Sequence, residues 1–279
     1  MNTMIDIETE VQTASKQGAS KEPLQKIQKE SGQEALQQIP VVEIKGLFKA
    51  YDHRPVLKGV NLTVGKGENV VVLGKSGSGK SVLIKCVVGL ISPDKGEIFV
   101  LGNNIFELRY KELNKLRIKI GFLFQSAALY DSMTVGENLY FPLKQHDRRL
   151  SKEDAWKAIH DILESVGLSD AVDKMPSELS GGMCKRIGLA RTMILRPDVM
   201  LYDEPTTGLD TVTAREISEL IVFMQKKNKI SSIIITHDIA CAKITADRIV
   251  MLKDGVIEAE GTYEELSASD DQWVKAFFQ

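Results

Sequence analysis

The chain has 279 residues, 43% of them hydrophobic, and a formal net charge of -2. This length is sufficient for one large domain or two small ones with a sizeable core. Because the charges nearly balance, the composition excludes a global basic field for nucleic acid and we expect no nucleic-acid partner, although local basic patches stay possible. The cysteines Cys86, Cys184 and Cys241 are far apart, which argues against zinc or a disulfide framework and suits a reducing cytoplasm.

The sequence shows neither of two common membrane signals. Met1 to Glu10 lacks the basic start and apolar middle of a secretory signal. No run of about 18 apolar residues occurs, so we expect no membrane span. A separate subunit would then have to carry the chain to any membrane on which it works.

Residues 1–39 are rich in Gln, Lys, Glu and Ser and contain no aromatic residue. Such a segment buries too little apolar surface to offset its ordering entropy, so we expect a mobile polar tail. The alternative is a short helix that places Leu24, Ile27 and Leu36 against a partner. Residues 40–279 are expected to form the folded domain.

Short strands follow the tail. Val42 and Ile44 alternate with polar residues, which predicts a half-buried antiparallel strand, and residues 60–64 repeat the pattern before the fully apolar run 70–73. Tyr51 lies on a loop between them, where its ring could stack on adenine or could simply be a core or rim residue.

A glycine-rich loop follows the apolar run and matches the pattern G-x-x-x-x-G-K-[ST]. Its residues are Gly74, Lys75, Ser76, Gly77, Ser78, Gly79, Lys80 and Ser81. A helix is predicted over 82–88, so a strand, a loop and a helix occur in the order that a phosphate-binding loop requires. The glycines let backbone N–H groups approach phosphate oxygens, Lys80 would contact the β- and γ-phosphates, and Ser81 would bind Mg²⁺. The alternative, a glycine-rich turn with a chance lysine, does not account for the two flanks.

Further polar residues follow later apolar runs. The run 120–124 predicts a buried strand that ends at Gln125, whose amide could touch Mg²⁺ or its water. The run 199–202 delivers Asp203 and Glu204, which strand alternation points in different directions, so one can hold the metal's water while the other polarises an attacking water. A salt-bridge site is the alternative. The strand 233–235 places His237 on the same sheet edge, near an expected γ-phosphate; a structural histidine is the alternative.

The middle of the chain interrupts the strands. Residues 127–143 are apolar but irregular, which fits a docking surface or a packed loop. Ser151 and Asp154 predict a capped helix that ends at Gly167. Ser180, Gly181 and Gly182 then start a helix with free N–H groups, which predicts a second anion-binding helix end; structural glycines at a cap are the alternative.

The last ten residues, 270–279, contain Trp273, Phe277 and Phe278 and are more apolar than a free end should be. We therefore expect them to pack on a neighbouring subunit.

Over residues 41–266 the chain resembles the nucleotide-binding subunit of ATP-binding-cassette (ABC) transporters. The motifs that carry the resemblance are the A-loop Tyr51, Walker A Gly74 to Ser81, Q-loop Gln125, signature Leu179 to Met183, Walker B Val199 to Asp203, catalytic Glu204, D-loop Gly208 to Asp210 and switch His237. The resemblance implies an α/β P-loop NTPase with a RecA-like core, an antiparallel β subdomain, a helical subdomain at about 128–195 and a C-terminal extension at about 267–279.

The family further implies a head-to-tail homodimer in which each ATP lies between the P-loop of one copy and the signature helix of the other. Tyr51 and residues 74–81 would bind ATP in one copy, and Ser180, Gly181 and Gly182 would bind it from the other. The implied catalytic residues are Glu204, His237 and Gln125, and the implied Mg²⁺ ligands are Ser81, Gln125 and Asp203. The common signature ends in Gln, whereas Met183 stands here, so a side-chain contact of that Gln is lost.

Two stretches, 123–135 and 179–183, look like the ATPase subunit of Mla/Mce-type systems, which move phospholipids or other lipids across the envelope of diderm bacteria. That likeness implies a permease, a lipid-binding MCE-domain protein and sometimes a small regulatory subunit as partners. It also implies a peripheral location on the cytoplasmic side of the inner membrane. The alternatives are a transporter for another solute, a soluble cassette ATPase of DNA repair, chromosome structure or translation, and a non-hydrolysing nucleotide switch.

Overall fold

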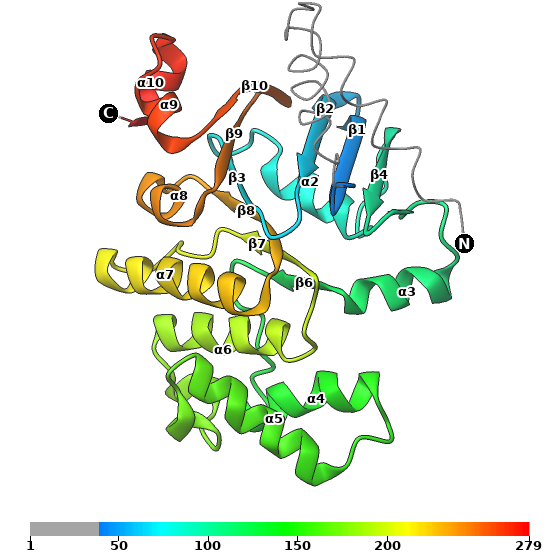
Figure 1. The fold of residues 1–279 in the computed structure, drawn as a ribbon, viewed down its shortest axis with the longest axis vertical. Coiled ribbons are helices and arrows are strands. Elements are labelled where there is room, and N and C mark those ends of the chain that lie inside the picture. The colour runs from blue at the N-terminus through cyan, green and yellow to red at the C-terminus, as the bar shows by residue number, and fades with distance from the viewer. Residues whose placement is uncertain (1–38, 279) are drawn as a thin grey trace, which may run out of the picture. The chain divides into compact units, whose positions relative to one another are not determined.

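The computed structural model describes residues 39–278, which form two β-sheets and a set of helices (Figure 1). The expected mobile tail, apart from Ile39, lies outside the described residues. No helix within 39–278 combines the length and the apolar character that crossing a membrane requires.

The smaller sheet is antiparallel in the strand order β2-β1-β4-β5. Its strands are β1 (Val42–Tyr51), β2 (Arg54–Val64), β4 (Lys95–Val100) and β5 (Asn103–Asn104). Val42 pairs with Val64 at one end of the β1–β2 ladder, and both side chains are fully buried. The alternating pattern therefore correctly predicted antiparallel strands with one buried face.

The larger sheet has the strand order β10-β9-β3-β8-β7-β6. Its strands are β3 (Asn69–Leu73), β6 (Ile120–Leu123), β7 (Val199–Asp203), β8 (Ser231–Thr236), β9 (Arg248–Lys253) and β10 (Val256–Gly261). All neighbours pair in parallel except β9 and β10, which form an antiparallel hairpin. The central strands are buried on both faces, which explains their continuous apolar runs.

Alternate residues of β3 enter two different cores. Val70 and Val72 belong to a core between the two sheets, where α2 (Lys80–Val87) contacts strands of both. Val71 and Leu73 belong to a second core on the opposite face, to which the helices after β6 contribute side chains. The six-stranded sheet therefore lies between two apolar layers, as the α/β fold class predicts.

Helices cover the second face and extend beyond it (Figure 1). They are α4 (Val135–His146), α5 (Lys152–Ser165), α6 (Gly181–Met193), α7 (Thr211–Asn228), α8 (Ile239–Thr245), α9 (Tyr263–Ser267) and α10 (Gln272–Phe278), whereas α3 (Tyr110–Ile118) contacts β6. Helices α4, α5 and α6 pack on one another and appear together in green in Figure 1.

The expectation of an irregular segment over 127–143 is wrong from Val135 onward, because α4 begins there. Thr134 caps this helix, accepting a hydrogen bond from the backbone N–H of Glu137 at 3.2 Å. The side chain of Asn138 is fully buried and donates to backbone carbonyls of the preceding turn, including that of Tyr130 at 3.1 Å. Pro142 inside the helix obscured the pattern, since proline usually breaks a helix.

The aromatic side chains of the C-terminal end pack at least in part on their own chain. The rings of Trp273 and Phe277 lie 5.0 Å apart, and Phe278 meets Tyr263 at 5.4 Å. Val274 is buried in the second core. A neighbouring subunit is therefore not needed to explain why this segment is apolar.

Arg248 joins four segments at the edge of the sheets. Its guanidinium donates to the Glu68 carboxylate at 2.7 Å and to the backbone carbonyl of Thr63 at 2.6 Å, and it also contacts the Glu260 carboxylate. Burial alone would raise the pKa of Glu68, but hydrogen bonds from Arg248 and from the Gly65 N–H outweigh it and lower that pKa.

We predict that Glu68→Gln lowers the free energy of unfolding at pH 7 by about 1–3 kcal/mol, because the partly buried Arg248 loses a charged partner. A lowered folded pKa stabilises the fold above the usual value of 4.5, and this stabilisation disappears as the pH falls through the folded value. Urea unfolding at several pH values measures both effects. Glu97→Gln, at an exposed position on β4, is the matched control; equal stability of the two variants at pH 7 would contradict the prediction.

Candidate active site

The glycine-rich loop connects β3 to α2, as the pattern predicted. Gly77 and Gly79 have φ values of 81° and 108°, which favour glycine. A Cβ at Gly74 would lie 2.5 Å from the backbone oxygen of Leu252, and one at Gly79 would lie 3.0 Å from that of Val56. The loop thus needs glycine for both its backbone angles and its close packing. It leads to the start of α2, whose first N–H groups have no acceptor within the helix.

Lys80 lies across this loop with its side chain almost completely buried. Its ammonium group donates to the backbone carbonyls of Gly74 at 2.7 Å and Lys75 at 3.2 Å. A carboxylate oxygen of Glu204 lies 3.8 Å away. Burial lowers the pKa of Lys80, while the charges of Glu204 and Asp203 oppose the shift. The geometry places one positive charge where a phosphate on this loop would need it.

Ser81 and Asp203 meet at the ends of α2 and β7. The Ser81 hydroxyl donates to Asp203 Oδ1 at 2.9 Å, and Asp203 is 7% exposed. Gln125, from the loop after β6, lies with Ser81 in the lining of the cavity described below. Among residues 39–278 no group of three or more His, Cys, Asp and Glu could hold a metal on its own. This sparse oxygen set fits Mg²⁺, which usually retains water and takes other ligands from phosphate.

Glu204 follows Asp203 directly and has a left-handed backbone. Its φ is 52°, unusual for a residue other than glycine, and its N–H donates to the Ile235 carbonyl at 2.9 Å. The carboxylate Oε2 lies 2.8 Å from His237 Nδ1 and accepts from the Thr207 hydroxyl at 3.1 Å. The two acids have separate partners, since Asp203 accepts from Ser81 whereas Glu204 contacts His237, Thr207 and Lys80.

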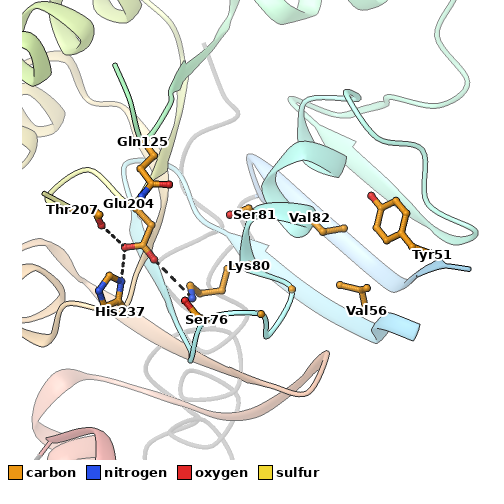
Figure 2. Close-up of a pocket in the computed structure, with 12 residues that line it drawn as sticks. Tyr51, Val56, Ser76, Lys80, Ser81, Val82, Gln125, Glu204, Thr207 and His237 are labelled. Atoms are coloured by element: carbon orange, nitrogen blue, oxygen red, sulfur yellow. Dashed lines mark hydrogen bonds and ion pairs between the residues drawn. The ribbon is translucent and has the colours of Figure 1, made fainter. Parts of the chain in front are cut away.

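Most of these groups line one cavity of about 400 Å³, whereas Asp203 is not in its lining and reaches it through Ser81. The lining residues are Tyr51, Val56, Ser76, Gly77, Gly79, Lys80, Ser81, Val82, Gln125, Glu204, Thr207 and His237. Figure 2 shows Glu204 between Thr207, His237 and Lys80, with Tyr51 and Val56 on the far side of Ser81. Tyr51 is 45% exposed at this rim, where a flat apolar group could rest against its ring.

Ser180, Gly181 and Gly182 are not among the residues that line this cavity in the described chain. Ser180 caps α6, since its hydroxyl accepts from the Met183 N–H at 3.3 Å. A Cβ at Gly182 would lie 2.5 Å from Thr213 Cγ2, so this position has no room for a larger residue. The cap uses only the backbone of Met183 and does not depend on the unusual side chain.

The sequence analysis missed several residues that the fold brings to the site. Val56 and Thr207 line the cavity, and Lys185 is buried behind it with hydrogen bonds to two site residues. Thr207 lies three residues after Glu204, and this spacing could have indicated that its hydroxyl contacts the Glu204 side chain. The sequence carried no signal for Val56 or for the buried contacts of Lys185.

The model of the ABC transporter family matches residues 57–207. The chain belongs to this family. Its fold is that of an α/β P-loop NTPase, and it is an ABC ATPase. The dimeric structure of the bacterial ABC transporter cassette MJ0796 has a TM-score of 0.74 and 33% identity, covering 80% of this chain and 98% of that one. A second structure of that cassette, a dimeric post-hydrolysis state bound to ADP and Pi, has a TM-score of 0.72 and 34% identity, with the same coverage.

The sequence relatives have different transport descriptions. The intermembrane phospholipid transport system ATP-binding protein MlaF of Haemophilus influenzae is 36% identical over 239 residues, which is 86% of this chain and 90% of that protein. A probable ribonucleotide transport ATP-binding protein of Mycobacterium leprae is 38% identical over 240 residues, which is 85% of this chain and 68% of that protein. The L-cystine import protein TcyN of Bacillus subtilis is 38% identical over 229 residues, 81% of this chain and 87% of that one. These relatives share the cassette but not one cargo.

We predict that Lys80→Met weakens MgATP binding about 10- to 100-fold, because a hydrogen bond to a charged group contributes about 1.5–3 kcal/mol. Titration with a fluorescent ATP analogue measures the dissociation constant. Lys66→Met, in the exposed turn at the opposite end of β3, is the matched control and should bind like the unmodified protein. Unchanged affinity in Lys80→Met would exclude a phosphate contact for this lysine.

Proposed function

We propose that this ATPase is the energy-transducing subunit of a transporter that moves a phospholipid or another lipid across the cell envelope. In this proposal a head-to-tail homodimer binds integral permease subunits at the cytoplasmic side of the inner membrane. An MCE-domain lipid-binding protein and a small regulatory subunit complete the system. The observation that carries the hydrolytic part is the position of Glu204, which contacts His237, Thr207 and Lys80 beside the phosphate loop.

The proposed roles follow from these contacts. Tyr51 and the loop from Gly74 to Ser81 hold ATP, while Ser81, Gln125 and Asp203 hold Mg²⁺. When bound, Mg²⁺ would neutralise phosphate charge during phosphoryl transfer.

In the proposed hydrolysis step, Glu204 accepts a proton from water or orients that water. His237 fixes the direction of the Glu204 carboxylate through the 2.8 Å contact. Gln125 assists from beside Glu204, where Figure 2 shows its side chain in the lining of the same cavity. Lys80 supplies positive charge to the phosphates. Catalysis of this kind depends mostly on positioning and electrostatics.

The proposed dimer gives a function to the start of α6, the second predicted anion-binding helix end. Ser180, Gly181 and Gly182 would contact ATP on the partner copy, since they lie outside the cavity of their own chain. Gly181 is exposed at this helix start. Both MJ0796 cassette structures are described as dimeric, which supports this arrangement.

An apolar groove beside α4 is the proposed docking site for the permease. The groove has a volume of about 770 Å³, and its apolar lining includes Phe122, Phe124, Tyr130, Phe141 and Leu195. Three of these aromatic side chains are partly exposed, at 37% for Phe124, 47% for Tyr130 and 37% for Phe141. Residues 128–195 are the proposed helical subdomain, which forms one side of this groove, and residues 114–124 form the rest. Residues 267–279 are the proposed C-terminal extension.

Support for a lipid cargo comes from the MlaF relative and from the chloroplast protein trigalactosyldiacylglycerol 3 of Arabidopsis thaliana. The latter is 37% identical over 254 residues, which is 85% of this chain and 73% of that protein. A transporter for another solute is the second candidate, and the cystine relative with its similar identity favours it.

We predict that Glu204→Gln slows ATP turnover about 100-fold or more, since a general base contributes about 100- to 10,000-fold. Nucleotide affinity should change little, because the amide preserves the shape of the side chain. Phosphate release and analogue titration measure the two quantities, and light scattering with ATP should detect a dimer. Glu107→Gln, exposed before α3, is the control. Normal turnover in Glu204→Gln would remove the proposed role of this residue.

We predict that Phe141→Asp abolishes recovery of membrane proteins with the tagged chain, because a charge in the apolar groove costs desolvation energy. Nucleotide affinity should stay unchanged, since the groove and the ATP cavity share no lining residue. Detergent extraction, affinity purification and mass spectrometry provide the measurement.

Tyr110→Asp, on an α3 aromatic that is 75% exposed outside the groove, is the matched control. Loss of the same membrane proteins with both variants would count against a specific groove. The proteins recovered also decide between the cargo candidates: an MCE-domain partner supports lipid, and a partner that binds amino acids supports the second candidate. Recovery with ribosomes or DNA in place of a permease would overturn the transport proposal.

A further inference from the structure

Lys185 is a buried lysine on α6 to which the proposed mechanism gives no role. The residue is 6% exposed, although it lies only five positions after the cap residue Ser180. Its ammonium group donates to the backbone carbonyl of Gln125 and, at 3.3 Å, to that of Glu204. Burial lowers the pKa of Lys185, while the charges of Glu204 and Asp203 oppose the shift. A buried cation is costly unless it is bonded, and here it is bonded to two residues of the active site.

The two carbonyls belong to loops that are distant in the sequence. Gln125 lies two residues after the end of β6, and Glu204 lies directly after the end of β7. Because both acceptors are backbone atoms, Lys185 holds the peptide units from which the two side chains project. Glu204 depends on such support, since its φ of 52° is a conformation that persists only where the surroundings fix it.

Helix α6 also holds the residues that follow Gln125. Arg191 donates to the carbonyls of Ala128 at 2.7 Å and Ala127 at 3.1 Å. Both alanines have positive φ values, 59° and 49° for 127 and 128. A Cβ at Gly188 would lie 2.8 Å from the Cβ of Ala127, so the helix and the loop are in close contact. The loop after β6 is therefore held against α6 by hydrogen bonds and by close packing.

We propose that Lys185 is a positioning residue that couples the two nucleotide sites of a dimer. It links the start of α6 to the Glu204 and Gln125 backbones of the same chain. The proposal rests on the proposed function, because only in a head-to-tail dimer does the start of α6 contact the partner's nucleotide. Five residues of α-helix span about 7.5 Å, so a displacement of the Ser180 end reaches Lys185 with little loss.

A purely structural role for Lys185 has different consequences. Loss of a structural bond lowers stability, but leaves the turnover of each folded molecule unchanged. Loss of a positioning bond lowers kcat at constant nucleotide affinity, because Lys80 and the phosphate loop do not hydrogen-bond to Lys185 in the described chain. It also lowers cooperativity between the sites. These differences make the proposal testable by kinetics.

The experiment measures steady-state ATP hydrolysis, the Hill coefficient for MgATP, nucleotide affinity and thermal unfolding of the full-length chain. We predict that Lys185→Met lowers kcat about 10- to 100-fold, as small misplacements of catalytic groups do, and brings the Hill coefficient from above 1 to about 1. The dissociation constant for nucleotide should stay within about twofold of the original value. Lys185→Arg keeps the charge and N–H donors and should restore most of kcat and the cooperativity.

Lys157→Met is the matched control, because this lysine is exposed on the neighbouring helix α5. It should leave all four quantities unchanged. Should Lys185→Met fail to fold, Lys185→Gln answers the same question, since its shorter amide can reach only one carbonyl at a time. A reduced kcat and Hill coefficient in that variant would then support the proposal.

The proposal is overturned if Lys185→Met, or Lys185→Gln in its place, unfolds at a lower temperature but keeps the original kcat and Hill coefficient for each folded molecule. A Hill coefficient of 1 in the unmodified protein would overturn it too. If the unmodified protein does not hydrolyse ATP in any assembly, the proposed function fails instead. The outcomes therefore separate an error about Lys185 from an error about the function.

Discussion

The structure depends on how a few opposite charges are held together at one edge of a parallel sheet. The Lys80 ammonium lies 3.8 Å from the Glu204 carboxylate, with Asp203 bonded to the neighbouring Ser81. Charges with so little exposure are stable only when they are paired and hydrogen-bonded. The partners of Lys80 are two carbonyls of the loop and the Glu204 carboxylate, and the partner of Asp203 is the Ser81 hydroxyl. An anionic phosphate with its cation could replace those partners without leaving a buried charge alone.

Parallel pairing explains why these residues meet. In the ladder between β3 and β8, Leu73 lies beside Thr236, and in the ladder between β7 and β8, Asp203 lies beside Ile235. All three strands therefore end at the same edge, and the residues that follow them come together. The apolar runs have to be buried on both faces, so their ends are where polar side chains can collect.

This logic explains what could be predicted from the sequence. Lys80, Gln125 and His237 line one cavity, and the sequence could indicate this because each follows an apolar run of a parallel strand. Helix α4 was missed because Pro142 interrupts its pattern and because a buried polar residue, Asn138, stands among its apolar ones. Helix α7 received no prediction, although the cap at Asp210 and buried residues at helical spacing could have indicated it. The left-handed backbone of Glu204 depends on contacts between distant segments, which no local pattern encodes.

The start of α6 and its later turns differ in charge, and this difference fits two roles: the start can bind an anion, and the later turns position active-site loops. Its first turn carries no acidic residue and presents two glycines, so this end can offer an anion backbone N–H groups and the Ser180 hydroxyl. Two of its cations lie further along and are bonded to backbone carbonyls, Lys185 to those of Gln125 and Glu204 and Arg191 to those of Ala127 and Ala128. The third, Arg186, bonds to the Val166 carbonyl and the Glu216 carboxylate. The same rigid helix therefore has one end available to a ligand and a side committed to the loops of its own active site. In the proposed dimer, a displacement of the exposed end would reach those loops through Lys185, which is buried and hydrogen-bonded to both.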